Sequence, residues 1–131
     1  KEIWKFFKKM NSPHLTKKNT FYRPWGKYIN LFTGKGFLLK ELVINSNSSI
    51  SLQKHLHRSE RWFVNSGRPR ITINKKVSFK EVNDIVIIPK NTIHRIENIS
   101  KKPVQIIEVQ MGDILKETDI VRYKDIYGRI K

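Results

Sequence analysis

The chain from residue 21 to residue 111 is a series of short runs rich in β-branched and aromatic residues, separated by Gly, Asn and Ser. Many short strands at close, regular spacing, with almost no helix between them, are typical of an antiparallel sandwich or barrel. The expected strands are 27–32, 37–44, 50–57, 61–65, 70–74, 77–79, 85–88, 93–98 and 104–111. The sequence therefore predicts an all-β fold.

The two ends of the chain have a different texture. Ile3, Phe6, Phe7 and Met10 follow the three-and-four spacing of one apolar helix face, and Pro13 lies just beyond. We expect residues 1–20 to form a short N-terminal helix and a linker, and residues 21–131 to form the β domain. The tail, residues 112–131, alternates acids, bases and aromatics, so we expect coil or short helix lying across the barrel.

The composition excludes several kinds of functional site and any membrane-spanning segment. The 131 residues include no cysteine, which excludes disulfides, thiolate zinc sites and cysteine nucleophiles. No apolar run approaches the roughly 20 residues of a membrane span, and no signal-peptide core is visible. We expect one cytoplasmic domain with no membrane partner. The chain begins with Lys, so it is also expected to be a piece of a longer protein.

The charge balance is strongly basic, with 27 Lys and Arg against 11 Asp and Glu, a net charge of +16. Such a balance is found in nucleic-acid-binding proteins. Here the basic residues are scattered, no helix presents a basic stripe, and no Gly-aromatic RNA-binding signature is present. We therefore expect no nucleic acid as primary partner, and interpret the charge as a compositional bias helped by an anionic substrate.

Two of the four histidines, His55 and His57, stand one residue apart and are followed by Glu60. Side chains alternate faces along an extended strand, so Gln53, His55 and His57 would point the same way. Imidazoles and a carboxylate that converge are ligands for a divalent metal. Taken alone, the same residues also fit a polar strand whose histidines face water.

His94 lies in a second region with the same chemistry. The apolar run 85–88 reads as a strand that Pro89 ends, and Asn91 tolerates the positive φ of a tight turn. His94 then opens the next strand and can face into a barrel beside His55 and His57. The alternative is a histidine that serves only the core or the turn.

Together the two regions resemble the paired motifs of the cupins. The pattern is His-x-His, a following Glu, six residues and Gly, then Pro-x-x-x-x-His-x-x-x-Asn. The resemblance implies a double-stranded β-helix, a jelly-roll barrel, with metal ligands His55, His57, Glu60 and His94. The sequence departs from the motifs in two ways: Ser49 and Asn91 replace usual glycines, and Glu60 follows His57 by one residue fewer than usual.

Further motifs make the chain similar to the isomerase domain of type II phosphomannose isomerases. They are Arg-Pro-Trp-Gly at 23–26, Ser-Leu-Gln at 51–53, His-Arg-x-Glu-x-Trp at 57–62, Ile-Glu-Val-Gln at 107–110, Asp-Ile-Val-Arg at 119–122 and Asp-Ile-Tyr-Gly-Arg at 125–129. The resemblance implies interconversion of mannose 6-phosphate and fructose 6-phosphate, feeding nucleotide-sugar and polysaccharide synthesis. It implies one divalent metal ion, zinc first, with manganese, iron, cobalt or nickel as alternatives. In that family a guanylyltransferase domain commonly precedes this one; no Gly-rich nucleotide-binding loop is present in these residues.

The catalytic candidates are Glu108 and Lys40. Val104, Ile106 and Glu108 share one strand face, which suits a strand that passes from packed core into a polar cavity, so Glu108 is the candidate general base. A carboxylate on the outer face is the equal alternative. Lys40 resembles a family lysine and would donate to a sugar oxygen or transfer the proton; a lysine at a sheet edge is its alternative.

The substrate-binding candidates are one amide and three arginines. Gln53 is either an extra metal ligand or a group that orients substrate. Arg23, Arg95 and Arg129 lie inside the family-like motifs and carry the forked donors that suit a phosphate. Any single arginine of so basic a chain also fits a solvated surface residue.

Two other functions stay open from the sequence. One is a non-catalytic cupin that binds a sugar phosphate or metal, and the other is a cupin that acts on a different sugar. Exposed sheet edges on a small β barrel also make a homodimer an expected partner arrangement.

Overall fold

The computed structural model describes residues 19–124, so the expected N-terminal helix and Arg129 lie outside the described residues. Within 19–124 the chain forms only strands and loops, which confirms the all-β prediction. This part contains no helix long and apolar enough to cross a lipid bilayer. The strands are β1 (Thr20–Arg23), β2 (Gly26–Gly34), β3 (Phe37–Ile44), β4 (Ser48–Ser49), β5 (Leu52–Lys54), β6 (Arg58–Ser66), β7 (Arg70–Ile73), β8 (Lys76–Phe79), β9 (Ile85–Ile88), β10 (His94–Asn98), β11 (Val104–Gly112) and β12 (Val121–Lys124).

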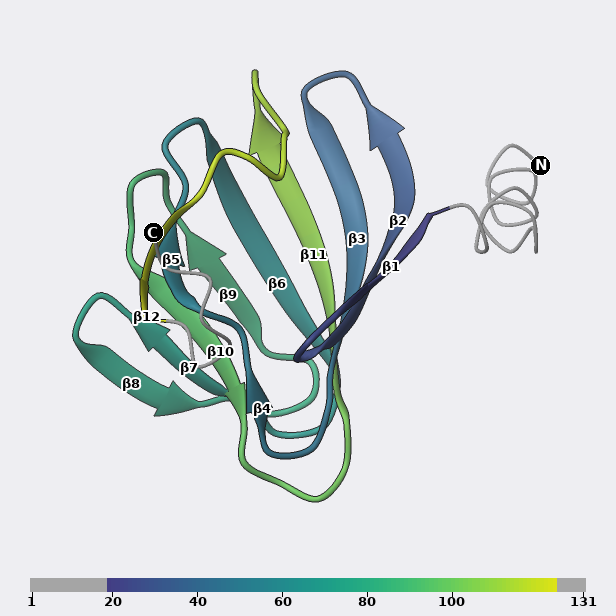
Figure 1. Ribbon diagram of the computed structural model, residues 1–131, viewed down its shortest axis with the longest axis vertical. Helices are drawn as coiled ribbons and strands as arrows, with labels where there is room; N and C mark the ends of the chain where they lie inside the picture. The colour runs from purple at the N-terminus through teal and green to yellow at the C-terminus, as the bar shows by residue number, and fades with distance from the viewer. Residues whose placement is uncertain (1–18, 125–131) are drawn as a thin grey trace.

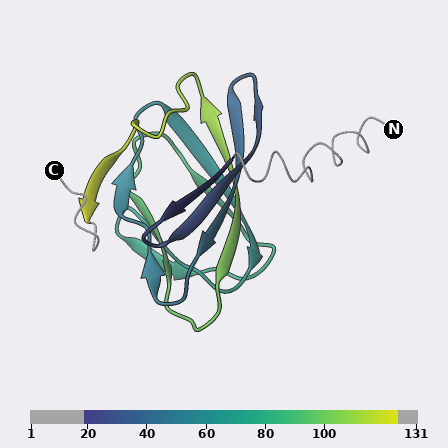
Figure 2. The same ribbon diagram turned by 45° about the vertical axis from the view of Figure 1, so that its right-hand side comes forward.

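The strands form two antiparallel sheets that face each other (Figures 1 and 2). The first has the order β1-β2-β3-β11-β6-β9, and the second has the order β12-β5-β10-β7-β8, with β4 paired to β10. After β11 the chain leaves the first sheet and crosses to β12 in the second, seen as the yellow-green trace in Figure 1. We call this crossing segment, residues 113–120, the strap.

The inner face of β11 changes from apolar to polar along its length. In β11, Val104 and Ile106 are fully buried in the core, and the next inward residues are Glu108 and Gln110. The register of β11 with β3 pairs Ile106 with Leu42 and Glu108 with Lys40, so the change occurs at the same level in both strands. A core therefore fills one end of the barrel and a polar cavity the other.

The apolar end is a single cluster contributed by both sheets. Its fully buried members include Trp62, Ile44 and Ile96. Burying such side chains contributes about 1.5–3 kcal/mol each, which offsets the cost of the polar groups at the other end. The core thus provides the rigid support on which the cavity residues are held.

The strands differ from the expected ones at the places that shape the cavity. The expected strand 50–57 is regular only over Leu52–Lys54, and the tail expected as coil or helix contains β12. Strands β1 and β4 were not expected. Asn91 has φ 59°, which confirms the predicted positive φ, and its backbone N–H donates to the carbonyl of His55 at 2.8 Å. That bond ties the turn before His94 to the first histidine.

Candidate functional site

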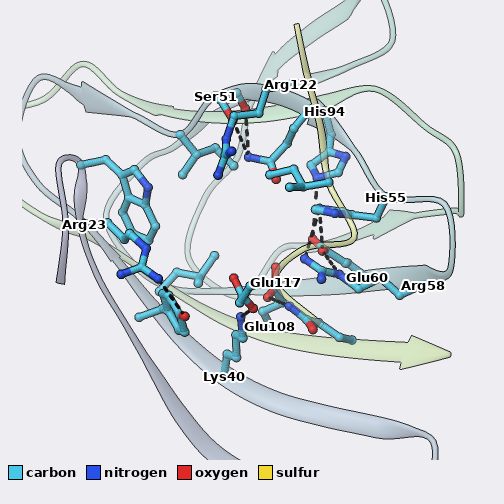
Figure 3. A pocket seen from close by; sticks show the side chains of 17 residues that line it. Arg23, Lys40, Ser51, His55, Arg58, Glu60, His94, Glu108, Glu117 and Arg122 are labelled. Carbon is cyan, nitrogen blue, oxygen red and sulfur yellow. Dashed lines mark hydrogen bonds and ion pairs between the residues drawn. The ribbon is translucent and has the colours of Figure 1, made fainter. Parts of the chain in front are cut away.

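Three potential metal ligands converge at the polar end of the barrel (Figure 3). His55 follows β5, Glu60 lies in β6 and His94 begins β10, and their ligand atoms all lie within 4.8 Å of one another. His55 Nε2 is 3.1 Å from one carboxylate oxygen of Glu60, and His94 Nε2 is 3.8 Å from the other. All three residues are buried. The fold therefore brings together three of the four metal ligands that the sequence motifs predicted.

His57, the fourth proposed ligand, is exposed and lies outside this cluster. The expectation that it shares a face with Gln53 and His55 required an unbroken strand, and β5 ends at Lys54. Two irregular residues separate His55 from β6, so the alternation of side chains stops there. Residue 58 takes the inward place instead.

That residue is Arg58, whose guanidinium lies inside the cluster. Its Nε donates to Glu60 at 2.9 Å, and its Nη2 is 3.2 Å from His55 Nε2. Burial first, then the positive charge of Arg58 and the neighbouring His94, lower the pKa of His55 to about 4. Burial alone would raise the pKa of Glu60, but His94 and Arg58 outweigh it and hold that pKa below its ordinary value. Neutral imidazole and ionised carboxylate are the forms that bind metal.

The orientation of both rings also fits a metal. His55 Nδ1 is 2.6 Å from the carbonyl of Asp119, and His94 Nδ1 is 2.8 Å from the carbonyl of Thr92. Because a carbonyl only accepts, each Nδ1 carries a hydrogen, and each Nε2 is turned toward the Glu60 carboxylate, where an ion would bind. His94 Nε2 is buried without a hydrogen-bond partner among the described residues. An orphaned nitrogen of this kind is what a metal ion would satisfy, so the residues fit a divalent metal.

Glu108 lies beside the cluster, on the inner face of β11, and not on the outer face that was its alternative. Trp62 Nε1 bridges the two carboxylates, donating to Glu108 at 2.9 Å and to Glu60 at 3.1 Å. Gln110 donates to the second oxygen of Glu108 at 2.9 Å. Burial first, and then the charge of Glu60, raise the pKa of Glu108 to about 7. A carboxyl group with that pKa exchanges a proton readily near neutral pH.

Lys40 and Arg23 both line the same cavity (Figure 3). Lys40 is buried, its ammonium lies 4.0 Å from the centre of the Tyr28 ring, and it pairs with Glu117 of the strap. Arg23 donates to the Tyr28 hydroxyl at 3.2 Å. Two cations thus flank the ring of Tyr28 on the wall of the cavity.

The other proposed substrate-binding residues fall in different places. Gln53 is buried in the cavity wall, directly opposite His94 in the register of β5 and β10, and its amide nitrogen donates to Ser51. Arg95 follows His94 in β10 and therefore has the opposite facing; it pairs with Glu97 at 3.5 Å. Arg129 lies outside the described residues.

Sequence reasoning missed the residues that support the cluster. Trp62, Arg58 and Asp119 were not among the predicted site residues, yet each forms hydrogen bonds at the cluster. All three lie inside motifs that resemble the family, at 57–62 and 119–122, so the signal was their membership of those motifs. Strand alternation could not find Asp119, because the strap is irregular.

Comparison with known proteins identifies the family. The model of the mannose-6-phosphate isomerase C-terminal family matches residues 10–125. The chain is 40% identical over 109 residues to mannose-1-phosphate guanylyltransferase ManC of Salmonella typhimurium, covering 83% of this chain and 23% of that protein. It is 43% identical over 108 residues to alginate biosynthesis protein AlgA of Pseudomonas putida, covering 82% and 22%. The chain thus spans about a quarter of the length of these curated relatives.

Solved structures identify the fold. The cupin domain of Schizosaccharomyces pombe Cnp3 superposes with a TM-score of 0.62 at 19% identity, covering 66% of this chain and 64% of that one. At such identity the likeness concerns the fold alone. With the family model matched over most of its length, the chain belongs to the mannose-6-phosphate isomerase C-terminal family and adopts the cupin fold.

Proposed function

We propose that this domain is a metal-dependent isomerase that interconverts mannose 6-phosphate and fructose 6-phosphate. The observation that carries the proposal is the convergence, in a member of this family, of a His55–Glu60–His94 cluster and the buried carboxyl of Glu108 on one cavity. The reaction needs a base that takes and returns one proton, and the cavity offers one beside the ligand cluster.

His55, Glu60 and His94 would hold the ion, and Gln53 is the candidate for a further oxygen ligand. Two observations support this role: Gln53 lies opposite His94, and its hydrogen bonds among the described residues use only the amide nitrogen, not the oxygen. A bound divalent ion, zinc first by the ligand types, supplies Lewis-acid polarisation of the sugar oxygens at C1 and C2. His57 would have to turn inward to join this set.

Glu108 is the proposed general base. Its carboxylate takes the proton from C2 of the aldose as Lys40 donates a proton to the carbonyl oxygen O1, giving the enediol. Glu108 then returns its proton to C1, and the proton of O2 passes back to Lys40, giving the ketose. The raised pKa of Glu108, caused by burial and by Glu60, matches a group that must both accept and release a proton.

The phosphate is proposed to bind near Arg23, with Arg129 as a second donor. Arg23 lines the same cavity as the cluster, on the opposite side from His55 and Glu60 in Figure 3, and its guanidinium suits bidentate binding of phosphate oxygens. Arg95, on the opposite face of its strand, is left out of this proposed phosphate site.

A coupled assay of the metal-loaded chain with mannose 6-phosphate tests the function. We expect fructose 6-phosphate to form, and we expect His94→Ala to lose both metal and activity. Full activity in a metal-free His94→Ala variant would contradict the proposed mechanism. An inactive wild type that holds metal would favour the non-catalytic sugar-phosphate-binding cupin.

The partners and location are proposals as well. Relatives include proteins named for guanylyltransferase and alginate biosynthesis, so we propose a role in mannose-derived polysaccharide synthesis in the cytoplasm, with a guanylyltransferase domain or partner. Strand β9 is an edge of the first sheet and exposes Ile85 and Ile87, which supports a homodimer.

A further inference from the structure

The strap, residues 113–120, makes several contacts with the residues of the cavity. The Arg58 guanidinium donates through Nη1 to the carbonyl of Lys116 at 3.2 Å, and Lys40 pairs with Glu117. The most extensive contacts are those of Asp119, which is buried although it lies in an irregular segment. The strap is therefore attached to the same side chains that form the site.

Asp119 accepts hydrogen bonds from three consecutive residues. Its two carboxylate oxygens accept the backbone N–H groups of Leu56 and His57, each at 2.9 Å. Its own carbonyl lies 2.6 Å from Nδ1 of His55. Burial would raise the pKa of Asp119, but the two backbone N–H groups, with the nearby His57 and His55, lower it below its ordinary value.

Residues 55–57 need this support because no strand pairing holds them. They lie between the end of β5 at Lys54 and the start of β6 at Arg58. The Asp119 carboxylate takes the place of a neighbouring strand for two of their N–H groups, which would otherwise lose partners. The same attachment keeps the Asp119 carbonyl within reach of the His55 ring.

We propose that Asp119 is a positioning residue that fixes the tautomer and orientation of His55, so that the strap forms part of the metal site. The inference rests on the proposed metal site in the function above. The carbonyl of Asp119 accepts from Nδ1–H, so the lone pair of His55 lies on Nε2, the nitrogen that Arg58 Nη2 faces at 3.2 Å and that would bind the ion. The carboxylate anchors that carbonyl to the loop that carries His55.

The test compares Asp119→Ala and Asp119→Asn with the control Asp84→Ala. The Asp84 carboxylate also accepts a backbone N–H, from Glu81 at 2.7 Å, but in an exposed turn away from the site. Zn²⁺ affinity is measured by competition with a chromophoric chelator. Loss of a group that orients a ligand typically weakens binding about 10–100-fold, which we expect for Asp119→Ala. Asp119→Asn keeps one acceptor oxygen, so its Zn²⁺ affinity should lie between those of the wild type and Asp119→Ala. Asp84→Ala should bind Zn²⁺ as tightly as the wild type does.

A second measurement separates positioning from a merely structural role. Nitrogen-15 NMR of the metal-free imidazoles should show the Nδ1–H tautomer for His55 in the wild type and in Asp84→Ala, and a mixture in Asp119→Ala. A folded Asp119→Ala protein with unchanged Zn²⁺ affinity and unchanged His55 tautomer would overturn the proposal. If Asp119→Ala does not fold, Asp119→Asn decides by the same two readings. If the wild type binds no Zn²⁺, the proposed function fails, and the tautomer still decides the role of Asp119.

Discussion

The two histidines of the cluster are oriented in the same way by very different parts of the chain. His94 donates to the carbonyl of Thr92, two residues earlier, whereas His55 is held by Asp119, 64 positions away. The first ring is oriented as soon as its own turn forms. The second depends on the docking of the strap, so the same local chemistry has local support on one side and long-range support on the other.

The largest expected effect comes from removing either ring. His55→Ala and His94→Ala should each weaken Zn²⁺ binding more than about 100-fold, because loss of a ligand exceeds the loss of a group that orients one. Isothermal titration of both variants, with circular dichroism as the check on folding, makes the measurement. Equal losses of affinity would show that the ion needs both histidines, however each ring is supported. Wild-type affinity in either variant would exclude that histidine as a metal ligand.

The next effect concerns Glu108, which is held by neighbours on regular strands. Glu108→Gln keeps its size and its contact with Trp62 but removes the base, so kcat should fall by about 10²–10⁴-fold while Zn²⁺ content stays unchanged. Steady-state kinetics with mannose 6-phosphate and metal analysis of the same sample check this. A kcat within a few-fold of the wild type would assign the base elsewhere.

The same substitution has a consequence for stability in the metal-free protein. The pKa of Glu108 is raised from 4.5 to about 7 in the fold, so the folded protein holds this proton more tightly than the unfolded chain does. The resulting contribution to the free energy of unfolding is complete below pH 4.5 and is lost as the pH rises through 7. Between these limits the wild type should lose on the order of 3 kcal/mol relative to Glu108→Gln. Urea unfolding of both proteins from pH 4 to pH 8 measures it, and parallel curves would contradict the assignment of a raised pKa.

A smaller effect is expected from the other attachment of the strap. Glu117 is 50% exposed, and its pairing with Lys40 should be worth at most about 1 kcal/mol because solvent screens it. Glu117→Gln should therefore change Zn²⁺ affinity less than about 5-fold, well below the loss in Asp119→Ala. A loss as large as that of Asp119→Ala would show that the strap acts as a whole and not through Asp119.

The smallest effect should come from Thr92→Ala. The support of His94 comes from the backbone carbonyl of Thr92, which the substitution keeps, and within residues 19–124 the Thr92 hydroxyl donates to the carbonyl of Lys90. We expect Zn²⁺ affinity within about two-fold of the wild type, since substitutions of partly exposed side chains away from the core change little. A tenfold loss would mean that the turn needs its side chain as much as the strap needs Asp119.

The outcome of the sequence interpretation follows the same division. Strand alternation and motif spacing predicted the all-β fold, most strands of the first sheet, and the meeting of His55, Glu60 and His94. These features depend on neighbours in sequence or on a regular period. His57 was misplaced because β5 ends at Lys54, which no period reveals.

The support of His55 could not be predicted, for a physical reason. Asp119 contacts residues 55–57 from an irregular segment, so neither helical nor strand periodicity marks it as inward-facing. The inward place of Arg58 could not be predicted either, because it follows from the break after β5. Residues that form long-range hydrogen bonds to loops can be found in a sequence motif, but the motif does not show which way their side chains point.

The position of the strap in the chain sets an order of assembly during synthesis. Ribosomes release a chain from its N-terminal end, at about 5–20 residues per second. The barrel strands through β11, including His55, Glu60 and His94, are therefore made before the strap, and Asp119 is among the last described residues to emerge. A nascent barrel can therefore close its core first, and the full capacity to capture an ion appears only after the strap has been made.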